Sequence, residues 1–143
     1  MHWPSCFEDR LRDWNLLRQE CQDASIPEAL LKINDWWMQA PLSTQHIAWE
    51  DWKEWPTPWD LLLDNTWCEL TRGIGIVYTL GLVFGDDFET TYLVDSNEGI
   101  LVVVGPDKYF LNYCFGDLDA IELDHLKTTR SINAKKLEHF RLN

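Results

Sequence analysis

The residue best suited to chemistry is a cysteine that follows a tight loop and opens a predicted helix. Cys68 comes directly after Asn65-Thr66-Trp67 and falls in the first turn of that helix. Backbone N–H groups and the helix dipole stabilise an anion at such a position, so a Cys68 thiolate would be placed to attack an acyl carbon. The position alone is a weak signal, because many buried cysteines near helix starts share it.

A cysteine nucleophile needs a base, and histidine is the most common one. His46 precedes a predicted helix, and His125 lies in the sequence Leu-Asp-His-Leu. For both residues an ordinary surface or capping role is the simpler interpretation. His2 and His139 are weaker candidates, since they lie near the two ends of the sequence.

No pattern in the chain is typical of a metal or cofactor site, and we expect neither. Asp60, Asp64 and Glu69 are close in sequence, but no histidine accompanies them, and the helix dipole explains carboxylates near helix starts. The cysteines never form a Cys-x-x-Cys pair, which favours reduced and mostly buried thiols. They are Cys6, Cys21, Cys68 and Cys114.

Three predicted helices lead up to and include the segment that carries Cys68. A capping box with proline at the first helical position predicts a helix over 26–39. The same start signal predicts a short helix over 57–63. Asn65 or Thr66 would cap a third helix that takes in Trp67 and runs towards residue 82.

The second half of the chain predicts a small antiparallel sheet. Apolar and β-branched runs separated by turn residues predict strands at 88–94, 100–104 and 109–113. The middle strand should be central, with the third helix on one face and the tryptophan-rich region on the other. Gly73 and Gly75 weaken the third helix, so we expect a neighbouring element to approach closely there. Residues 133–142 predict a short C-terminal helix.

The composition fits one α+β domain, with N-terminal helices packed on a small antiparallel sheet. The 143 residues are 45% hydrophobic, which is enough for a single core. We assign helices to about 5–83, the sheet to about 88–123 and a basic segment to 126–143, all within one domain, 1–143. A net charge of −12 disfavours direct nucleic-acid binding, and no apolar run is long enough for a membrane span.

The segment around Cys68 also carries a more specific pattern. Its residues are Trp55, Pro58, Asp60, Leu62, Cys68 and Glu69. They resemble two motifs of the bacterial transglutaminase-like cysteine peptidases, a Trp-x-x-Pro-x-Glu-x-Leu run and a Gly-Asp-Cys-Glu-Asp helix start, with aspartate here in place of the first glutamate. The resemblance covers about residues 52–115, and it implies a transglutaminase-like core of the papain type.

The resemblance also implies where the partners of the cysteine would lie. The family has its catalytic histidine at the head of the strand that follows the helix, and an orienting aspartate or asparagine on the return strand. These positions hold Gly99 and Asn112 here. A tight hairpin would pair Val103 with Phe110 and Leu101 with Asn112, which puts position 99 on the same face as Asn112. The imidazole that the family uses as its base is therefore missing.

Loss of the base removes most of the acyl-transfer rate, so we expect no enzyme activity. Cys68, Gly99 and Asn112 would be remnants in a binding or building unit. Residues 26–37 and 55–62 further resemble small proteins of tailed bacteriophages, notably cyanophages. This implies a virion component of the neck, tail or baseplate, present in several copies, in contact with other virion proteins and assembled in the host cytoplasm.

Tryptophan supplies the candidate contact residues. All nine tryptophans lie in the first 67 residues, and tryptophan is enriched at interface hot spots. We expect Trp36, Trp37, Trp55 and Trp59 to be interaction residues. The alternative is that the tryptophans line the core.

Two other functions stay open at this point. The chain could be an active cysteine hydrolase that combines Cys68 with a remote histidine, His46 or His125. It could instead be an acidic mimic of nucleic acid that inhibits a DNA-binding protein. The second alternative rests on the span 86–124, which holds ten acidic residues and one basic residue, Lys108.

Overall fold

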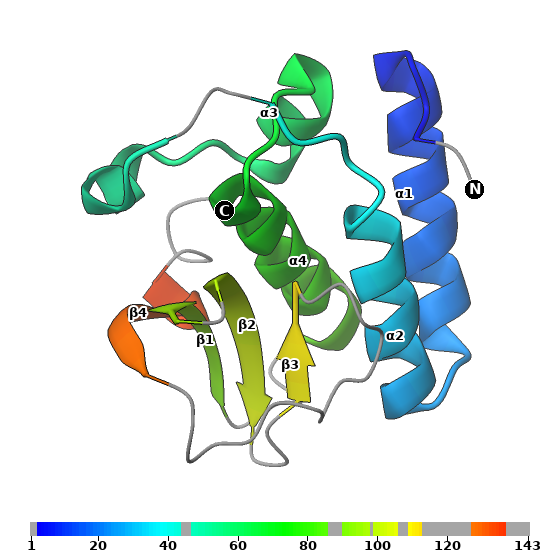
Figure 1. Ribbon diagram of the computed structural model, residues 1–143. Coiled ribbons are helices and arrows are strands. Elements are labelled where there is room, and N and C mark those ends of the chain that lie inside the picture. The colour runs from blue at the N-terminus through cyan, green and yellow to red at the C-terminus, as the bar shows by residue number, and fades with distance from the viewer. Residues whose placement is uncertain are drawn as a thin grey trace.

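Helices occupy the first part of the chain and strands the second. The computed structural model describes residues 3–43, 47–85, 90–97, 99–105, 109–112 and 127–136. The helices are α1 (Phe7–Gln22), α2 (Ile26–Trp37), the 3-10 helix η1 (Trp49–Glu54), α3 (Pro58–Asp64) and α4 (Glu69–Phe84). The strands are β1 (Thr90–Ser96), β2 (Gly99–Gly105), β3 (Tyr109–Leu111) and β4 (Thr128–Asn133). In Figure 1, α4 lies between the α1–α2 pair and the sheet, which confirms the predicted α+β class.

Local capping signals explain the starts of α2 and α3. The Ser25 side chain accepts a hydrogen bond from the Glu28 backbone N–H, as a capping serine should. At α3 the capping box is complete, because Thr57 and Asp60 exchange backbone-to-side-chain hydrogen bonds of 3.2 Å. Asn65 then ends α3 in the left-handed conformation, with φ of 53°.

The start of α4 differs from the prediction. Neither Asn65 nor Thr66 caps this helix; Cys68 is its N-cap residue, and Trp67 lies outside it. The physical reason is that the Asn65 side chain is already engaged, since its Oδ1 accepts the indole N–H groups of Trp3 and Trp67 at 2.8 Å each. Cys68 therefore precedes the first turn of α4, where the helix N–H groups begin.

The two glycines in the middle of α4 mark close approaches, as predicted. A Cβ atom on Gly73 would lie 2.8 Å from Leu93 Cδ1 of β1. A Cβ atom on Gly75 would lie 2.5 Å from the Trp37 ring of α2. That ring is fixed by a 2.9 Å hydrogen bond from its Nε1 to Thr79 Oγ1 on α4. The glycines thus allow α4 to pack tightly against the sheet on one side and α2 on the other.

The sheet has the order β3-β2-β1-β4, so the apolar β2 strand is interior, as predicted. The pairing of Val103 with Phe110 is also confirmed. The predicted pair between Leu101 and Asn112 does not form, because the ladder ends at Leu111 and Asn112 turns away with φ of 65°.

The strand β4 was not predicted, and the expected boundaries are wrong here. The sheet does not end near residue 123, because residues 128–133 of the basic segment pair with β1. Asn133, where a helix was expected to begin, ends this strand; residues 134–136 are helical, and the rest of the expected helix lies outside the described residues. The strand was missed because Ile132 is the one apolar residue in Thr-Thr-Arg-Ser-Ile-Asn, so no hydrophobic alternation marks it.

The two faces of the sheet belong to separate hydrophobic clusters. The helix-facing side joins the main core, which contains the buried tryptophans. The opposite side forms a second cluster of Tyr92, Val94, Leu101, Val103 and Phe110. None of the described tryptophans belongs to this second cluster, so the expectation that the tryptophan-rich region covers that face is wrong.

Candidate functional site

The positions singled out by the sequence meet at one end of the sheet. The Asn112 side-chain amide donates hydrogen bonds to the backbone oxygens of Glu69, at 2.9 Å, and Ile100, at 2.8 Å. Glu69 follows Cys68 at the start of α4, and Ile100 follows Gly99 at the start of β2. The Asn112 amide therefore ties the helix start to the strand start, and Cys68, Gly99 and Asn112 share one region of the fold.

A neighbouring carboxylate lies beside position 99. Gly99 has a φ of +99°, which L side chains rarely adopt. A Cβ atom built there would lie 3.0 Å from Glu69 Oε1 and 3.5 Å from Glu69 Cδ. The backbone conformation thus opposes a histidine at this position, whereas the exposed Glu69 side chain would only have to shift by a few tenths of an ångström.

Cys68 is held by a threonine one turn into α4. The Cys68 backbone N–H donates to Thr71 Oγ1 at 2.7 Å, and the Thr71 hydroxyl lies 3.0 Å from Cys68 O and 3.6 Å from Cys68 Sγ. Cys68 is only 5% exposed. Sequence reasoning missed Thr71, because Cys-x-x-Thr does not match the Ser/Thr-x-x-Glu/Gln pattern by which a capping box is recognised.

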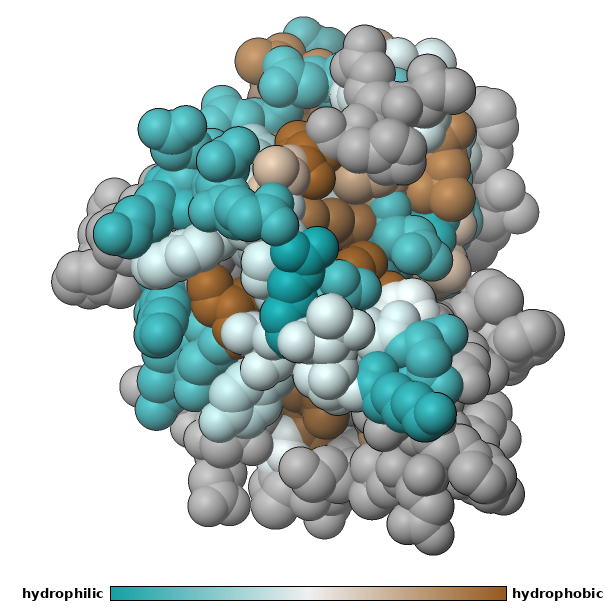
Figure 2. Space-filling model, turned by 60° about the vertical axis from the view of Figure 1, so that its left-hand side comes forward, coloured by the Kyte–Doolittle hydropathy of each residue, from teal (hydrophilic) through white to brown (hydrophobic). Residues whose placement is uncertain are grey.

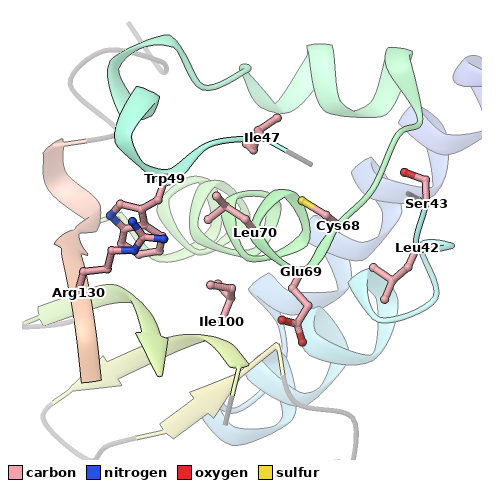
Figure 3. Close-up of a pocket in the computed structure, with 9 residues that line it drawn as sticks. All are labelled: Leu42, Ser43, Ile47, Trp49, Cys68, Glu69, Leu70, Ile100 and Arg130. Atoms are coloured by element: carbon pink, nitrogen blue, oxygen red, sulfur yellow. The ribbon is translucent and has the colours of Figure 1, made fainter. Parts of the chain in front are cut away.

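Cys68 lines a pocket of about 350 Å³ at this end of the sheet. Its other lining residues are Leu42, Ser43, Ile47, Trp49, Glu69, Leu70, Ile100 and Arg130. Figure 3 shows the Cys68 sulfur on the pocket side, while the Glu69 carboxylate points in a different direction. Figure 2 views the molecule with the left side of Figure 1 turned forward, and it shows hydrophobic patches within a largely hydrophilic face. The lining residues make the pocket mainly apolar with a few polar groups, which is typical of binding sites.

One wall of the pocket is fixed by Arg130 of β4. Its guanidinium donates to Glu50 Oε1 at 2.5 Å and to Asp95 Oδ2 at 3.0 Å, and its Cζ lies 5.2 Å from the centre of the Trp49 ring. A backbone hydrogen bond and the Arg130 guanidinium lower the pKa of Glu50. Sequence reasoning missed Arg130, because its partners lie 35 and 80 positions away along the chain.

Three of the four predicted interaction residues lie in the core. Trp36, Trp37 and Trp55 are buried, and their indole N–H groups donate to Asp13, Thr79 and Ala48, respectively. Trp59 differs, since its side chain is 42% exposed on α3 while one edge packs on Trp14. Trp59 is therefore the member of this set that the described surface offers to a partner.

Several predicted features lie outside the described residues. They are His2, His46, His125, His139, Cys114, Lys108 and much of the acidic span 86–124. Where the structure does describe the chain, it contains no group of three His, Cys, Asp or Glu residues that could hold a metal ion. No helix in the described ranges is long and apolar enough to cross a bilayer.

Comparison with known proteins gives no relative of this chain. No protein-family model, curated protein or solved structure matches it. The transglutaminase-like resemblance and the phage relationship therefore stay predictions from the sequence.

Proposed function

We propose that this chain is a non-catalytic binding and building unit based on a degenerate cysteine-peptidase site. The observation that carries the proposal is Gly99 itself, whose φ of +99° L side chains rarely adopt, at the position where the resemblance requires a catalytic imidazole. A thiol without a base at that position loses most of its acyl-transfer rate. The pocket beside Cys68 persists, so the site is suited to binding.

The role of Asn112 supports the same conclusion. In a triad, the third residue orients the base through its side chain. Here both donor bonds of the Asn112 amide go to backbone oxygens, of Glu69 and Ile100. Its backbone N–H donates to Asn34 Oδ1 at 2.6 Å, which adds α2 to the connection. The side-chain amide thus joins α4 to β2, and the backbone N–H adds α2, while Asn112 Oδ1 is buried without a hydrogen-bond partner among the described residues.

We further propose that the unit is a component of a tailed-bacteriophage virion, in the neck, tail or baseplate. Support comes from the resemblance of residues 26–37 and 55–62 to small phage proteins. An exposed pair one helical turn apart on α3, Trp59 and Leu63, offers an apolar contact for a neighbouring subunit. Such a component would be made in the host cytoplasm, occur in several copies and bind other virion proteins.

Mass spectrometry of purified particles tests this proposal. The chain should be present in several copies per particle, and Cys68→Ala particles should assemble with normal abundance and infectivity. Cys6→Ala serves as the matched control, because Cys6 is exposed and outside the pocket. Absence of the chain from particles would refute the virion role. Normal assembly with lost infectivity in Cys68→Ala alone would refute the non-catalytic role.

An active cysteine hydrolase is the second candidate, because the Cys68 sulfur at a helix start adjoins an open pocket. A thiol-reactive probe at mildly acidic pH distinguishes the two candidates. Stoichiometric labelling of Cys68 that is abolished by His46→Ala or His125→Ala would establish the hydrolase. Labelling that these variants leave unchanged would support the binding unit.

A further inference from the structure

The pocket beside Cys68 is bordered by an excess of negative charge. Among the described residues that line it, Arg130 is the one cation, and its guanidinium already binds two carboxylates, Glu50 and Asp95. Glu69 adds a third carboxylate directly on the lining. The described residues at this site thus contribute three carboxylates and one guanidinium, so a cationic group would be attracted to the pocket mouth.

Glu69 is the carboxylate available to such a cation. It is exposed, and no described side chain forms an ion pair or hydrogen bond with its carboxylate. The carboxylate lies beside Gly99, which has no side chain to cover it. Figure 3 shows it next to Ile100 at the border of the apolar lining. A ligand could therefore meet, at adjacent points, an apolar surface and a negative charge that no described side chain neutralises.

The interior of the pocket suits an apolar side chain. Five of its lining side chains are apolar: Leu42, Ile47, Trp49, Leu70 and Ile100. A volume of about 350 Å³ is at the small end of ordinary ligand sites. This space suits one aliphatic or aromatic side chain together with the backbone next to it.

We propose that the pocket binds a segment of a partner protein in which an aliphatic or aromatic side chain is followed by lysine or arginine. The apolar side chain enters between Ile47, Leu70 and Ile100, and the basic group pairs with the Glu69 carboxylate. This inference rests on the proposed binding function, because it assumes that the site holds its partner without cleaving it. The net charge of −12 favours encounter with a basic segment over an acidic one.

Capped peptides test the inference on the full chain. Ser-Leu-Lys-Ser, Ser-Leu-Glu-Ser and Ser-Ser-Lys-Ser differ only in the charge or the apolar group. Each is titrated while heteronuclear NMR follows the amide signals of Leu70 and Ile100. The Leu-Lys peptide should bind at least about fivefold more tightly than the other two, and added salt should reduce the difference between the Leu-Lys and Leu-Glu peptides. Equal affinities, or no shifts with any peptide, would overturn the inference.

A pair of variants tests the role of the carboxylate. Glu69→Gln should weaken binding of the Leu-Lys peptide about threefold, as expected for a partly exposed ion pair. Glu28→Gln is the matched control, since Glu28 is also an exposed glutamate in the first turn of a helix, α2, but outside the pocket. Equal loss of affinity in both variants would overturn the specific contact with Glu69.

Failure of this inference and failure of the proposed function give different results. If the Leu-Lys peptide binds as expected but is cleaved, and Cys68→Ala abolishes cleavage, the non-catalytic function is refuted and the ligand chemistry stands. If no peptide binds and none is cleaved, the ligand chemistry is refuted and the proposed virion role is unaffected.

Discussion

Replacing the Asn112 amide by a carboxylate tests whether this side chain holds the site together. Asn112 is 7% exposed, and its Nδ2 lies 2.9 Å and 2.8 Å from the backbone oxygens of Glu69 and Ile100. Asn112→Asp preserves the size of the side chain and tolerates the φ of 65°. It replaces a donor by an acceptor that faces two carbonyl oxygens, so the change is almost purely electrostatic.

The expected loss in the free energy of unfolding follows from these contacts. Two hydrogen bonds are lost, at about 1 kcal/mol each. The introduced carboxylate is also buried among oxygen atoms, which adds about 2 kcal/mol or more. We therefore expect Asn112→Asp to be less stable by about 4 kcal/mol near neutral pH, a large share of the roughly 5–15 kcal/mol that holds a domain together.

The same reasoning predicts a pH dependence with a definite sign. Burial and the two carbonyl oxygens disfavour the ionised form, so the pKa of the introduced carboxyl is higher in the folded state than in the unfolded chain. The loss of unfolding free energy in Asn112→Asp should be smallest below the ordinary aspartate pKa, about 4, where the introduced carboxyl is protonated and can donate one hydrogen bond. It should grow as the pH rises from there.

Urea unfolding followed by tryptophan fluorescence measures both effects, since the buried tryptophans report on the core. Asn112→Gly is the control, because it removes the same hydrogen bonds and keeps the positive φ without adding a charge. It should lose about 2 kcal/mol independently of pH. A neutral-pH stability of Asn112→Asp within about 1 kcal/mol of the native chain would refute the assigned hydrogen bonds.

Three further predictions follow from the packing and the charges. Gly75→Ala should lower stability by about 2 kcal/mol in urea unfolding, because its Cβ would overlap a buried indole ring; a gain in stability would contradict this packing. Burial raises the pKa of the Cys21 thiol. Alkylation near neutral pH, with the modified sites identified by mass spectrometry, should therefore be much slower at Cys21 than at the exposed Cys6. Equal rates at the two thiols would refute this. The lowered pKa of Glu50 stabilises the fold above the ordinary glutamate pKa, about 4.3, and this contribution disappears as the pH falls through the folded-state value. When the free energy of unfolding is measured at decreasing pH, Arg130→Gln should lose less stability on acidification than the native chain. The same loss in both proteins would contradict this prediction.

Signals confined to a few neighbouring residues predicted the starts of α2 and α3. Ser25 and Thr57 cap α2 and α3 as expected, since a side chain that bonds to a backbone N–H three residues away needs no other part of the fold. The glycine positions of α4 also showed that close packing was required, although the sequence did not say whether Trp37 or Leu93 would approach.

Local signals were insufficient where competition with distant residues decides the outcome. Asn65 has the right residue type to cap α4, yet its side chain accepts the indole N–H of Trp3, which is 62 positions away. Trp36 and Trp37 belong to a residue type that is common at interfaces. In the fold, however, they are buried where α1, α2 and α4 pack together. Residue type limits what a side chain can do, and the choice among those roles depends on which groups the fold brings near.

The amino-acid order alone was enough to identify Cys68 at a helix start, the three-stranded core of the sheet and the glycine at position 99, because each is a local or short-range pattern. Folding was needed to add β4, to bring Arg130 across the pocket and to turn the Glu69 carboxylate towards Gly99. The reason is physical. Contacts between residues 30 to 80 positions apart leave no periodicity or capping signal in the sequence, and they exist only once burial of the common core holds the separate segments together.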